Sequence, residues 1–531
     1  METIEMSQAT LRKATFVLLT AALAVGPFST SEILAQAPAA SGSGQSATQG
    51  PTLSITMDQA VAMALEANLG LKADRLSPEI QSQVLAAAKA FYNPQFVTGA
   101  SRFNSESAPT SFLDSTATSV TSATNRFSTG VSQNLQWYGG NYQVSWGGSR
   151  TENSSAGNPF NPQLGSTFSV TFSQPLLRNF LTDSARTSVK ANTIQQQITD
   201  TILAENVART ARDARLQYLN LIGAIEGRKV AQQNLDVARE SLRNDRARVG
   251  VGLMAPVDIV GSEASVADRE DALIIAEGQI ARAMDQLRQF ILDPARPDYW
   301  TVTIVPTDPI NAEPRQIDVD AAVKTALDNR SDLVTARKNL EITRTQLAML
   351  HNQTLPNLDF RVNYTGTGTA GTQFKYGGND FVNPVSSTSK GFGSAIGDAF
   401  GNVQPAWTYS LQLGYPIGRS DTKANYTRSQ LQMRQLELQL HESEISVALQ
   451  VRDAARQVET SFKRVQTSRA SLDAQQRRLE AEQKRFEVGT SDTFRLFQVQ
   501  RDVAAQRVAV LQAMLGYSQA LINFEAVQRI R

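Results

Sequence analysis

Two long stretches without proline constrain the fold of this chain more than any other feature of its 531 residues. The spans 182–248 and 421–487 contain no proline, and the only glycines in them are Gly223 and Gly227. A continuous helix of this length would extend over about 100 Å. Because an isolated globular domain cannot cover such a helix, we expect a coiled coil or a wall of packed helices.

Apolar residues recur every seven positions along both stretches and continue beyond them, from Ile259 to Leu287 and from Leu496 to Phe524. The stripe in the first stretch is Val207, Ala214, Leu221, Leu235, Leu242 and Val249, and in the second it is Val451, Val458, Val465, Leu472, Leu479 and Phe486. Sustained heptads predict helices that supercoil against partners. The wide polar faces favour a wall that is wet on both sides, such as a tunnel, although a dimeric coiled-coil rod would explain the heptads equally well.

The second half of the chain repeats the first. DQAVAMALEANLGLKADR (58–75) matches DAAVKTALDNRSDLVTAR (320–337) at a shift of 262 residues, and QPLLR (174–178) matches YPIGR (415–419) at a shift of 241. Val251-Gly252 and Val488-Gly489 match at a shift of 237. One building plan of helix, alternating segment, helix, break and helix is therefore used twice.

Alternating segments follow Pro94 and Pro356. In 406–416 the residues Trp407, Tyr409 and Leu411 alternate with small or polar ones, and 166–175 shows the same period of two. A coiled-coil rod would not explain such strands. An apolar outside and a polar inside suit a transmembrane barrel, while a soluble sandwich has the same alternation.

Two further features concern the connections between these strands. The segments 127–137 and 142–150 predict an additional hairpin around Gly139 and Gly140, either in the barrel wall or elsewhere. The Gly- and Thr-rich run 365–381 predicts a loop on the outer surface.

The N-terminal region reads as a secretory signal. Arg12 and Lys13 precede the apolar run 14–25, which is too short to span a membrane, and small residues follow around Ala35 and Ala37. We therefore expect a signal peptide over 1–37 and a flexible Gly/Ser-rich leader over 38–52. The rest of the sequence has no apolar run of spanning length, so any membrane crossing by the mature protein is expected to use strands.

Composition argues against several classes of function. With 51 Lys and Arg against 50 Asp and Glu, no nucleic-acid surface is indicated. The absence of cysteine excludes disulfides, thiolate metal sites and a cysteine nucleophile, and the two histidines, His351 and His441, are far apart in sequence. We therefore expect no catalytic residues, no cofactor and no metal site, and an envelope enzyme such as a hydrolase is poorly supported.

The glycine-rich break RVGVGLMAPVDI (248–259) suggests either a phosphate-binding loop or a turn between helices. The chain contains no GxxxxGK, and a predicted long helix rather than a strand precedes the break. The heptad stripes continue on both sides, which favours a helical hairpin. Gly250, Gly252 and Gly489 would then supply the unusual backbone of the two turns, and Pro256 would begin the first returning helix.

These breaks, VGLMAPVDI (251–259) and VGTSDTFRLF (488–497), resemble the helical-hairpin tips of the TolC family of outer-membrane efflux and secretion channels. The resemblance extends over roughly 53–530 and includes the duplicated plan and the signal peptide. It implies an α+β, mostly helical fold: a trimeric channel-tunnel in which a long coiled-coil α-helical barrel joins a transmembrane β-barrel. Each protomer would give four strands to a shared twelve-stranded barrel.

The resemblance also sets boundaries for two structural repeats. The first, 53–317, would hold strands over about 96–175, a long helix 182–248, a tip 249–256, a return helix 257–291 and an equatorial linker. The second, 318–531, would hold strands over about 358–416, a long helix 421–487, a tip 488–492 and a return helix 493–530.

The implied function is a passive outer-membrane exit channel of a tripartite efflux or type I secretion system. A homotrimer in outer-membrane lipid would place its helices in the periplasm. It would bind a periplasmic adaptor (membrane fusion protein) and, through it, an inner-membrane pump of the RND or ABC type. The alternative is a structural coiled-coil envelope protein without pore activity.

The resemblance further implies two groups of site residues at the tips. The residues expected to dock the adaptor are Val249, Gly252, Leu253, Val488, Gly489 and Thr490. The family's gate often carries two Asp residues beyond the second tip, but the matching positions here are Arg495 and Gln498. The candidate pore constriction is therefore Asp258, Asp492, Phe494, Arg495 and Gln498, with hairpin packing as the alternative role for Phe494.

Overall fold

The structure is a computed structural model that describes residues 51–528 except 115–116, 157, 253, 379, 416 and 419, with the backbone alone at 112 and 380–382. The predicted signal peptide and nearly all of the predicted leader lie outside the described residues. The first repeat contains β1 (Thr52–Ile55), α1 (Met57–Ala67), α2 (Leu69–Asp74), α3 (Leu76–Ala90), β2 (Gln95–Ser107), a short 3-10 helix (Phe112–Asp114), β3 (Val120–Asn134), β4 (Asn141–Asn153), β5 (Phe160–Pro175), α4 (Ser184–Gly250), α5 (Pro256–Ile291) and β6 (Thr303–Pro306). The second contains α6 (Val319–Asn329), α7 (Ser331–Gln353), β7 (Asn357–Gly377), β8 (Asp380–Lys390), α8 (Phe392–Phe400), β9 (Pro405–Gly414), α9 (Asp421–Glu487) and α10 (Thr493–Gln528).

The long helices of the two repeats have equal lengths. Helices α4 and α9 each have 67 residues, and the returning helices α5 and α10 each have 36. Polar side chains cap both long helices at their N-termini, where Asp183 accepts from the N–H of Arg186 and Ser420 accepts from the N–H of Lys423. None of the helices in the described residues is both long and apolar enough to cross a membrane.

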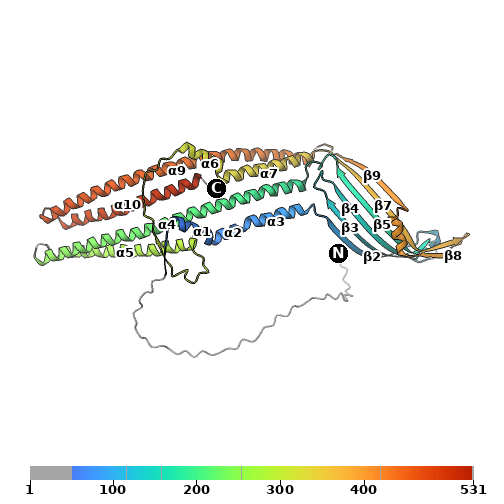
Figure 1. Cartoon of the computed structure of the whole chain (residues 1–531), viewed down its shortest axis with the longest axis horizontal. Coiled ribbons are helices and arrows are strands. Elements are labelled where there is room, and N and C mark those ends of the chain that lie inside the picture. Colours follow the sequence, from blue (N-terminus) through green and yellow to red (C-terminus); the bar gives the residue numbers. More distant parts are fainter. Residues whose placement is uncertain are drawn as a thin grey trace, which may run out of the picture. The chain divides into compact units, whose positions relative to one another are not determined.

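The helices lie side by side in one wall (Figure 1). On the side of the sheet α3 packs on α4, α4 on α7, and α7 on α9; on the side of the tips the order is α5, α4, α10 and α9. The heptad stripes lie inside this wall, since Leu221, Leu235, Val451, Val458 and Val465 are all buried. The seven-residue period of the sequence therefore marks the core of the helical wall.

Short equatorial segments brace the middle of the helices. Strands β1 and β6 pair in parallel, and the hydroxyl of Tyr218 on α4 lies 2.9 Å from both the carbonyl oxygen of Ile55 and a carboxylate oxygen of Asp308. Burial raises the pKa of Tyr218, so this hydroxyl stays protonated and can donate. In the second repeat Tyr517 on α10 donates to the carbonyl oxygen of Glu313 at 2.5 Å. Each repeat thus ties its own helix to the linker by one tyrosine.

Seven strands of the described chain form one antiparallel sheet in the order β2-β3-β4-β5-β7-β8, with β9 also pairing with β7. Strands β8 and β9 use the same edge of β7, β9 along 357–366 and β8 along 371–377. The sheet is therefore six strands wide wherever β8 or β9 pairs with β7. The expectation of four strands per protomer was wrong, because the hairpin of β3 and β4, centred on Gly139 and Gly140, lies within the sheet between β2 and β5.

The Gly- and Thr-rich run 365–381 was also misread. Residues 365–377 form the outer half of β7 and not a loop. The reason is helix α8, which packs on this strand: a Cβ atom on Gly366 or Gly368 would lie 2.2 or 2.0 Å from the carbonyl oxygens of Ala399 and Ala395. The glycines are needed for close packing inside a strand rather than for a turn.

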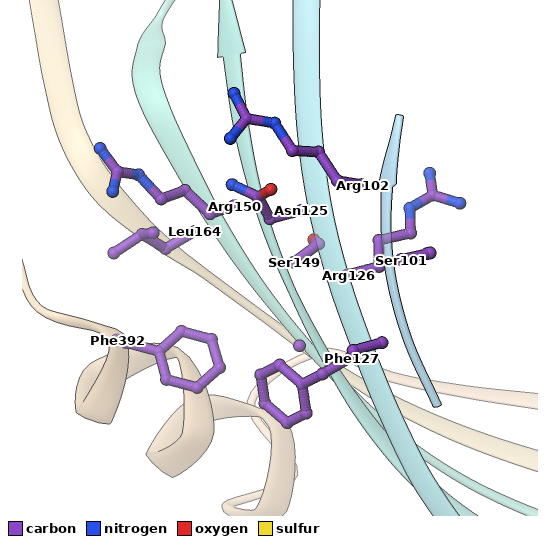
Figure 2. A pocket seen from close by; sticks show the side chains of 11 residues that line it. Ser101, Arg102, Asn125, Arg126, Phe127, Ser149, Arg150, Leu164 and Phe392 are labelled. Carbon is purple, nitrogen blue, oxygen red and sulfur yellow. The ribbon is translucent and has the colours of Figure 1, made fainter. Parts of the chain in front are cut away.

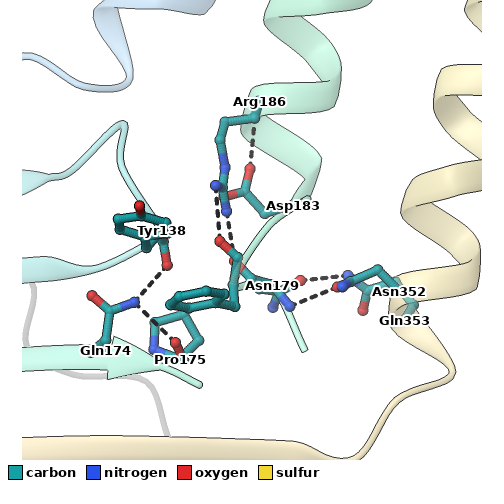
Figure 3. A network of polar contacts seen from close by, with 9 residues as sticks. Tyr138, Gln174, Pro175, Asn179, Asp183, Arg186, Asn352 and Gln353 are labelled. Carbon is teal, nitrogen blue, oxygen red and sulfur yellow. Dashed lines mark hydrogen bonds and ion pairs between the residues drawn. The ribbon is translucent and has the colours of Figure 1, made fainter. Parts of the chain in front are cut away.

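A polar network joins the sheet to the helices and the first repeat to the second (Figure 3). Asn179 has a positive φ of 66° and donates its N–H to the side chain of Asn352 at 2.7 Å, while Gln353 donates to the side chain of Asn179 at 2.6 Å. Arg186 donates to the carbonyl oxygen of Asn179 at 2.6 Å and pairs with Asp183 at 2.8 Å. This network fixes the start of α4 against the end of α7.

Candidate functional site at the hairpin tips

The two hairpin turns have the same backbone. Gly252 and Gly489 have φ values of +75° and +76°, and their N–H groups donate to the carbonyl oxygens of Val249 and Phe486, at 3.0 and 3.2 Å. Glycine adopts this left-handed conformation without the strain of a side chain, which is why it follows the last turn of each long helix. The glycine-rich breaks are therefore hairpin turns.

The residues predicted to dock an adaptor lie at these turns. Val488 is 73 % exposed, Gly252, Gly489 and Thr490 are exposed, and Val249 is half-buried. Thr490 is fixed by two bonds to the carbonyl oxygen of Arg485, from its N–H at 2.9 Å and from its hydroxyl at 3.1 Å. Leu253 lies outside the described residues.

The two tips are held side by side. The guanidinium of Arg248, on α4, lies 4.4 Å from the centre of the Phe486 ring on α9, a cation–π contact between the two hairpins. Further along, Gln500 on α10 donates to Ser241 on α4 at 3.0 Å. A displacement of one tip away from the other would break these contacts.

The constriction candidates of the second tip lie together at the start of α10. Asp492 accepts the N–H of Arg495 at 2.7 Å and so caps the helix. Phe494, Arg495 and Gln498 share the exposed side of α10, opposite the buried Leu496 and Val499. Phe494 is 68 % exposed, so its ring is not part of the packing inside the hairpin.

Asp258 occupies the equivalent place in the first hairpin, 237 residues before Arg495. It lies half-buried in the first turn of α5, where an acidic side chain interacts favourably with the helix dipole. The structure therefore places opposite charges at equivalent positions of the two tips. Among the described residues, no hydrogen bond or ion pair is recorded between Asp258 and Arg495 within the protomer.

The sequence prediction missed a pair of buried acids just before the tips. Asp245 is 3 % exposed and accepts from the hydroxyl of Ser262 at 2.6 Å; Glu482 is 8 % exposed, accepts from Ser491 and lies 3.6 Å from Arg485. The two acids are separated by the same 237 residues as the tips. Aligning the repeats at this shift was the signal that could have found them.

Charged pairs cover the outside of α9 near its tip. Lys484 donates to Glu480 at 2.9 Å, which raises the pKa of Lys484 and lowers the pKa of Glu480.

In the described part of the chain, no cluster of three or more His, Asp or Glu side chains is arranged to hold a metal ion.

Comparison with protein families decides the identity of this duplicated arrangement. The family model described as outer membrane efflux protein matches residues 141–291 and 322–527, more than half of the chain. The chain belongs to the outer membrane efflux protein family. A comparison with curated protein sequences gives no match at the threshold applied.

Solved structures of other outer-membrane proteins share the fold of this family member. The CmeC outer membrane channel of Campylobacter jejuni is 15 % identical, with a TM-score of 0.62 over 93 % of each chain. The VceC outer membrane protein of Vibrio cholerae is 12 % identical, with a TM-score of 0.60 over 89 % of this chain and 96 % of that one. The open state of the MtrE outer membrane channel of Neisseria gonorrhoeae is 16 % identical, with a TM-score of 0.58 over 89 % of each chain.

Family membership establishes the role of the architecture described above. This efflux protein is an outer-membrane exit channel, with its sheet in the membrane and its helices in the periplasm. Proteins of the family are trimeric and work with adaptor proteins and inner-membrane pumps. The match begins at residue 141, the first residue of β4, and so leaves out β2 and β3.

Proposed function

We propose that three copies of this chain close into one ring and form the passive exit duct of a tripartite efflux system, without enzymatic activity of its own. The observation that carries this proposal is that the described part of the protomer has two edges without a packing partner. One edge is formed by β2, α3 and α5, and the other by β9 and α9.

Both edges expose apolar side chains at spacings that place them on one face of a helix. Leu76, Ile80 and Val84 are exposed on α3, and Leu431, Leu438 and Ile445, seven residues apart, are exposed on α9. Apolar stripes of this kind mark contact surfaces, and heptad spacing is the seam of packed helices. Beside them β2 and β9 present free strand edges, which closure of a ring would pair. A homotrimer satisfies both edges at once, because each protomer offers one edge to each neighbour.

Closure would produce a wide barrel. Six strand positions from each of three copies give an eighteen-stranded wall in place of the twelve strands that the family resemblance implied. Barrels of 16–18 strands leave an aqueous channel, while eight-stranded ones are filled by side chains. The proposed duct is therefore narrowest in its helical part, which makes the hairpin tips the place for a gate.

The tips suit both roles proposed for them. Val249, Gly252, Leu253, Val488, Gly489 and Thr490 would dock the adaptor; those of them with described side chains are exposed or half-buried at the turns. Asp258, Asp492, Phe494, Arg495 and Gln498 would line the constriction, where three copies bring alternating acidic and basic groups together. A ring of mixed charge would not share the cation preference of a purely acidic one.

The ring is tested by a disulfide, since the natural chain has no cysteine. Ile80 lies ten residues before the sheet-side end of α3, and Leu431 lies ten residues after the sheet-side start of α9. The pair Ile80→Cys with Leu431→Cys should therefore give linked dimers and trimers on a non-reducing gel. The control pair Ile80→Cys with Leu449→Cys places the second thiol 18 residues, or about 27 Å, further along α9 and should stay monomeric. Equal yields from both pairs, or none from either in a protein that still conducts, would contradict the proposed edges.

The docking role is tested by photo-crosslinking. A crosslinker at Val488 should capture the periplasmic adaptor, while the same group at Trp300, an exposed equatorial residue, should not. Capture at Trp300 alone would move the docking surface away from the tips.

The constriction is tested by conductance. Arg495→Ala should raise the relative permeability to cations several-fold in single-channel recordings, because three positive charges leave the ring while Asp258 remains. Unchanged conductance and ion preference would exclude Arg495 from the constriction.

A further inference from the structure

The outward face of the sheet carries an unusual element, the nine-residue helix α8. Strand register places Val144, Val170, Tyr364 and Trp407 in one row on the same face, and this apolar face is the one that meets lipid in a membrane barrel. Helix α8 packs on this face: the Phe400 ring lies 4.7 Å from the ring of Phe168. A helix is therefore docked against the outside of the barrel wall.

A pocket of about 570 Å³ opens beside the first residue of α8 (Figure 2). Its apolar wall consists of Ala100 on β2, Phe127 on β3, Leu164 on β5 and Phe392 on α8. The two aromatic rings meet over Gly148, where a Cβ atom would lie 2.4 Å from Phe127 and 2.5 Å from Phe392. A glycine at this position is what leaves room for both rings and for the hollow next to them.

Three arginines line the pocket, and two of them, Arg102 and Arg150, form its rim on the lipid side. Arg102 on β2 and Arg150 on β4 both pair across the sheet with Asn125 on β3, so all three side chains lie in one row on the lipid face. Among the described residues the guanidinium of Arg102 contacts only the neutral amide oxygen of Asn104, at 3.3 Å. Arg150 pairs with Glu152 at 2.5 Å and remains half-exposed. The rim therefore keeps a net positive charge even with this carboxylate included.

The position of the arginines along the strands matches the edge of the lipid layer. On β2 the outward residues run Phe96, Thr98 and Ala100 before Arg102, and on β4 aromatic and aliphatic residues precede Arg150. Polar residues, Asn104 among them, follow toward the outer end. The guanidinium groups thus lie where the apolar band ends, at the level of lipid headgroups.

We propose that this pocket is a specific site for a lipid of the outer leaflet that carries an anionic phosphate headgroup. The phosphate is held by Arg102 and Arg150, because guanidinium binds phosphate with charge-assisted hydrogen bonds. One acyl chain lies against Phe127, Leu164 and Phe392. A volume of this size lies within the range of pockets that hold a small ligand. The inference rests on the proposed channel, since it requires that this face of the sheet meets lipid.

The test uses the purified full-length protein in nanodiscs of phosphatidylcholine with a minor fraction of phosphatidylglycerol. After detergent extraction, native mass spectrometry counts the lipids retained per assembly. Wild type should retain phosphatidylglycerol in preference to phosphatidylcholine, and the double variant Arg102→Gln with Arg150→Gln should retain about tenfold less. The matched control is Arg361→Gln, because Arg361 on β7 lies on the opposite face of the sheet and is not among the residues that line the pocket. The control should retain as much as wild type.

A second variant fills the pocket without changing its charge. Ala100→Trp should also lose the retained phosphatidylglycerol, since the indole would occupy the place of the acyl chain. Retention by Ala100→Trp, equal loss in Arg361→Gln, or equal retention of phosphatidylcholine would each overturn the site. Bilayer conductance separates the two proposals: a conducting wild type without lipid preference refutes the lipid site alone, while a protein without conductance refutes the channel on which it rests.

Discussion

The two repeats of this channel are equal in their helices and unequal in their strands. Both long helices have 67 residues and both returning helices have 36, but the first repeat gives four strands to the sheet and the second gives three and the helix α8. Helices that share one wall must begin at the sheet and turn at the tips at common levels, so an insertion in one of them would shift every heptad after it. A barrel accepts a further antiparallel hairpin without disturbing its other strand pairs.

Removal of the β3–β4 hairpin should have the largest effect on the difference between the two repeats. Deletion of residues 120–153 leaves β2 and β5 antiparallel, and Phe96 and Val170 already lie on the same face of the sheet. The variant should therefore close as a twelve-stranded barrel whose diameter is smaller by about one third, with the helices unchanged. Structure determination of the assembled variant measures the barrel diameter and shows whether the helices are unchanged. Failure of the variant to assemble, while its helices still fold, would show that β3 and β4 are required for closure.

The second-largest expected effect concerns the buried acids, whose partners differ between the two hairpins. Ser262→Ala leaves Asp245 buried without its recorded partner and should destabilise the first tip by about 2 kcal/mol. Ser491→Ala should cost less than about 1 kcal/mol, because Arg485 remains 3.6 Å from Glu482. Hydrogen exchange of the tip peptides in the assembled channel measures both local stabilities. Equal losses would mean that Arg485 does not compensate the carboxylate of Glu482.

The turn glycines should behave alike in both repeats. Gly252→Ala and Gly489→Ala each place a Cβ atom on a left-handed residue, at a cost of about 1 kcal/mol in local stability. In neither case is there a described atom within 4 Å of the added Cβ, so crowding adds nothing to either value. The same exchange experiment measures the cost. A large difference between the two variants would show that the turns differ in a way that their φ values do not reveal.

The helices could be predicted from the sequence because their signals are local. A run without proline and a seven-residue period determine length and buried face, and α9 spans the predicted 421–487. The sheet could be predicted only in part. The segments 127–137 and 142–150 predict a hairpin, but its partners β2 and β5 are non-local. Likewise, the segment around Gly366 and Gly368 shows no apolar alternation, because these glycines leave room for α8 to pack on β7.

The buried acids near the tips could likewise not be recognised as buried from the sequence. Asp245 and Glu482 look like solvated charges in a polar helix, because burial depends on how α4 and α5, or α9 and α10, pack together. The alignment of the repeats identifies them as equivalent, but the serines that hold them are not equivalent. Ser262 lies on α5, whereas Ser491 lies in the turn before α10. A pattern of duplication therefore locates such a pair without revealing its contacts.

The smallest expected difference concerns the matching arginines of the two repeats. Arg75 donates to the carbonyl oxygen of Leu65 at 3.0 Å, and Arg337 donates to that of Leu327 at 3.2 Å. Arg337 also donates to Glu444 on α9 at 3.0 Å. At neutral pH, Arg75→Ala and Arg337→Ala should each cost about 1 kcal/mol for the carbonyl bond. The second should cost roughly 0.5 kcal/mol more, since the ion pair is partly exposed.

The difference in stability loss between Arg337→Ala and Arg75→Ala should disappear at acidic pH. The hydrogen bond from Arg337, with a smaller contribution from the neighbouring His441, lowers the pKa of Glu444 below its ordinary value. A depressed carboxyl pKa stabilises the folded state above the unfolded pKa, and this stabilisation is lost as pH falls through the folded pKa. The extra cost of Arg337→Ala should therefore be complete at pH 7, start to fall near the ordinary Glu pKa of about 4.3 and disappear only below the lowered pKa of the folded state. Hydrogen exchange at the α6–α7 and α2–α3 corners measures it, with His441→Ala as control. If the difference does not shrink as the pH falls from 5 to 3, the contact with Glu444 is not its cause.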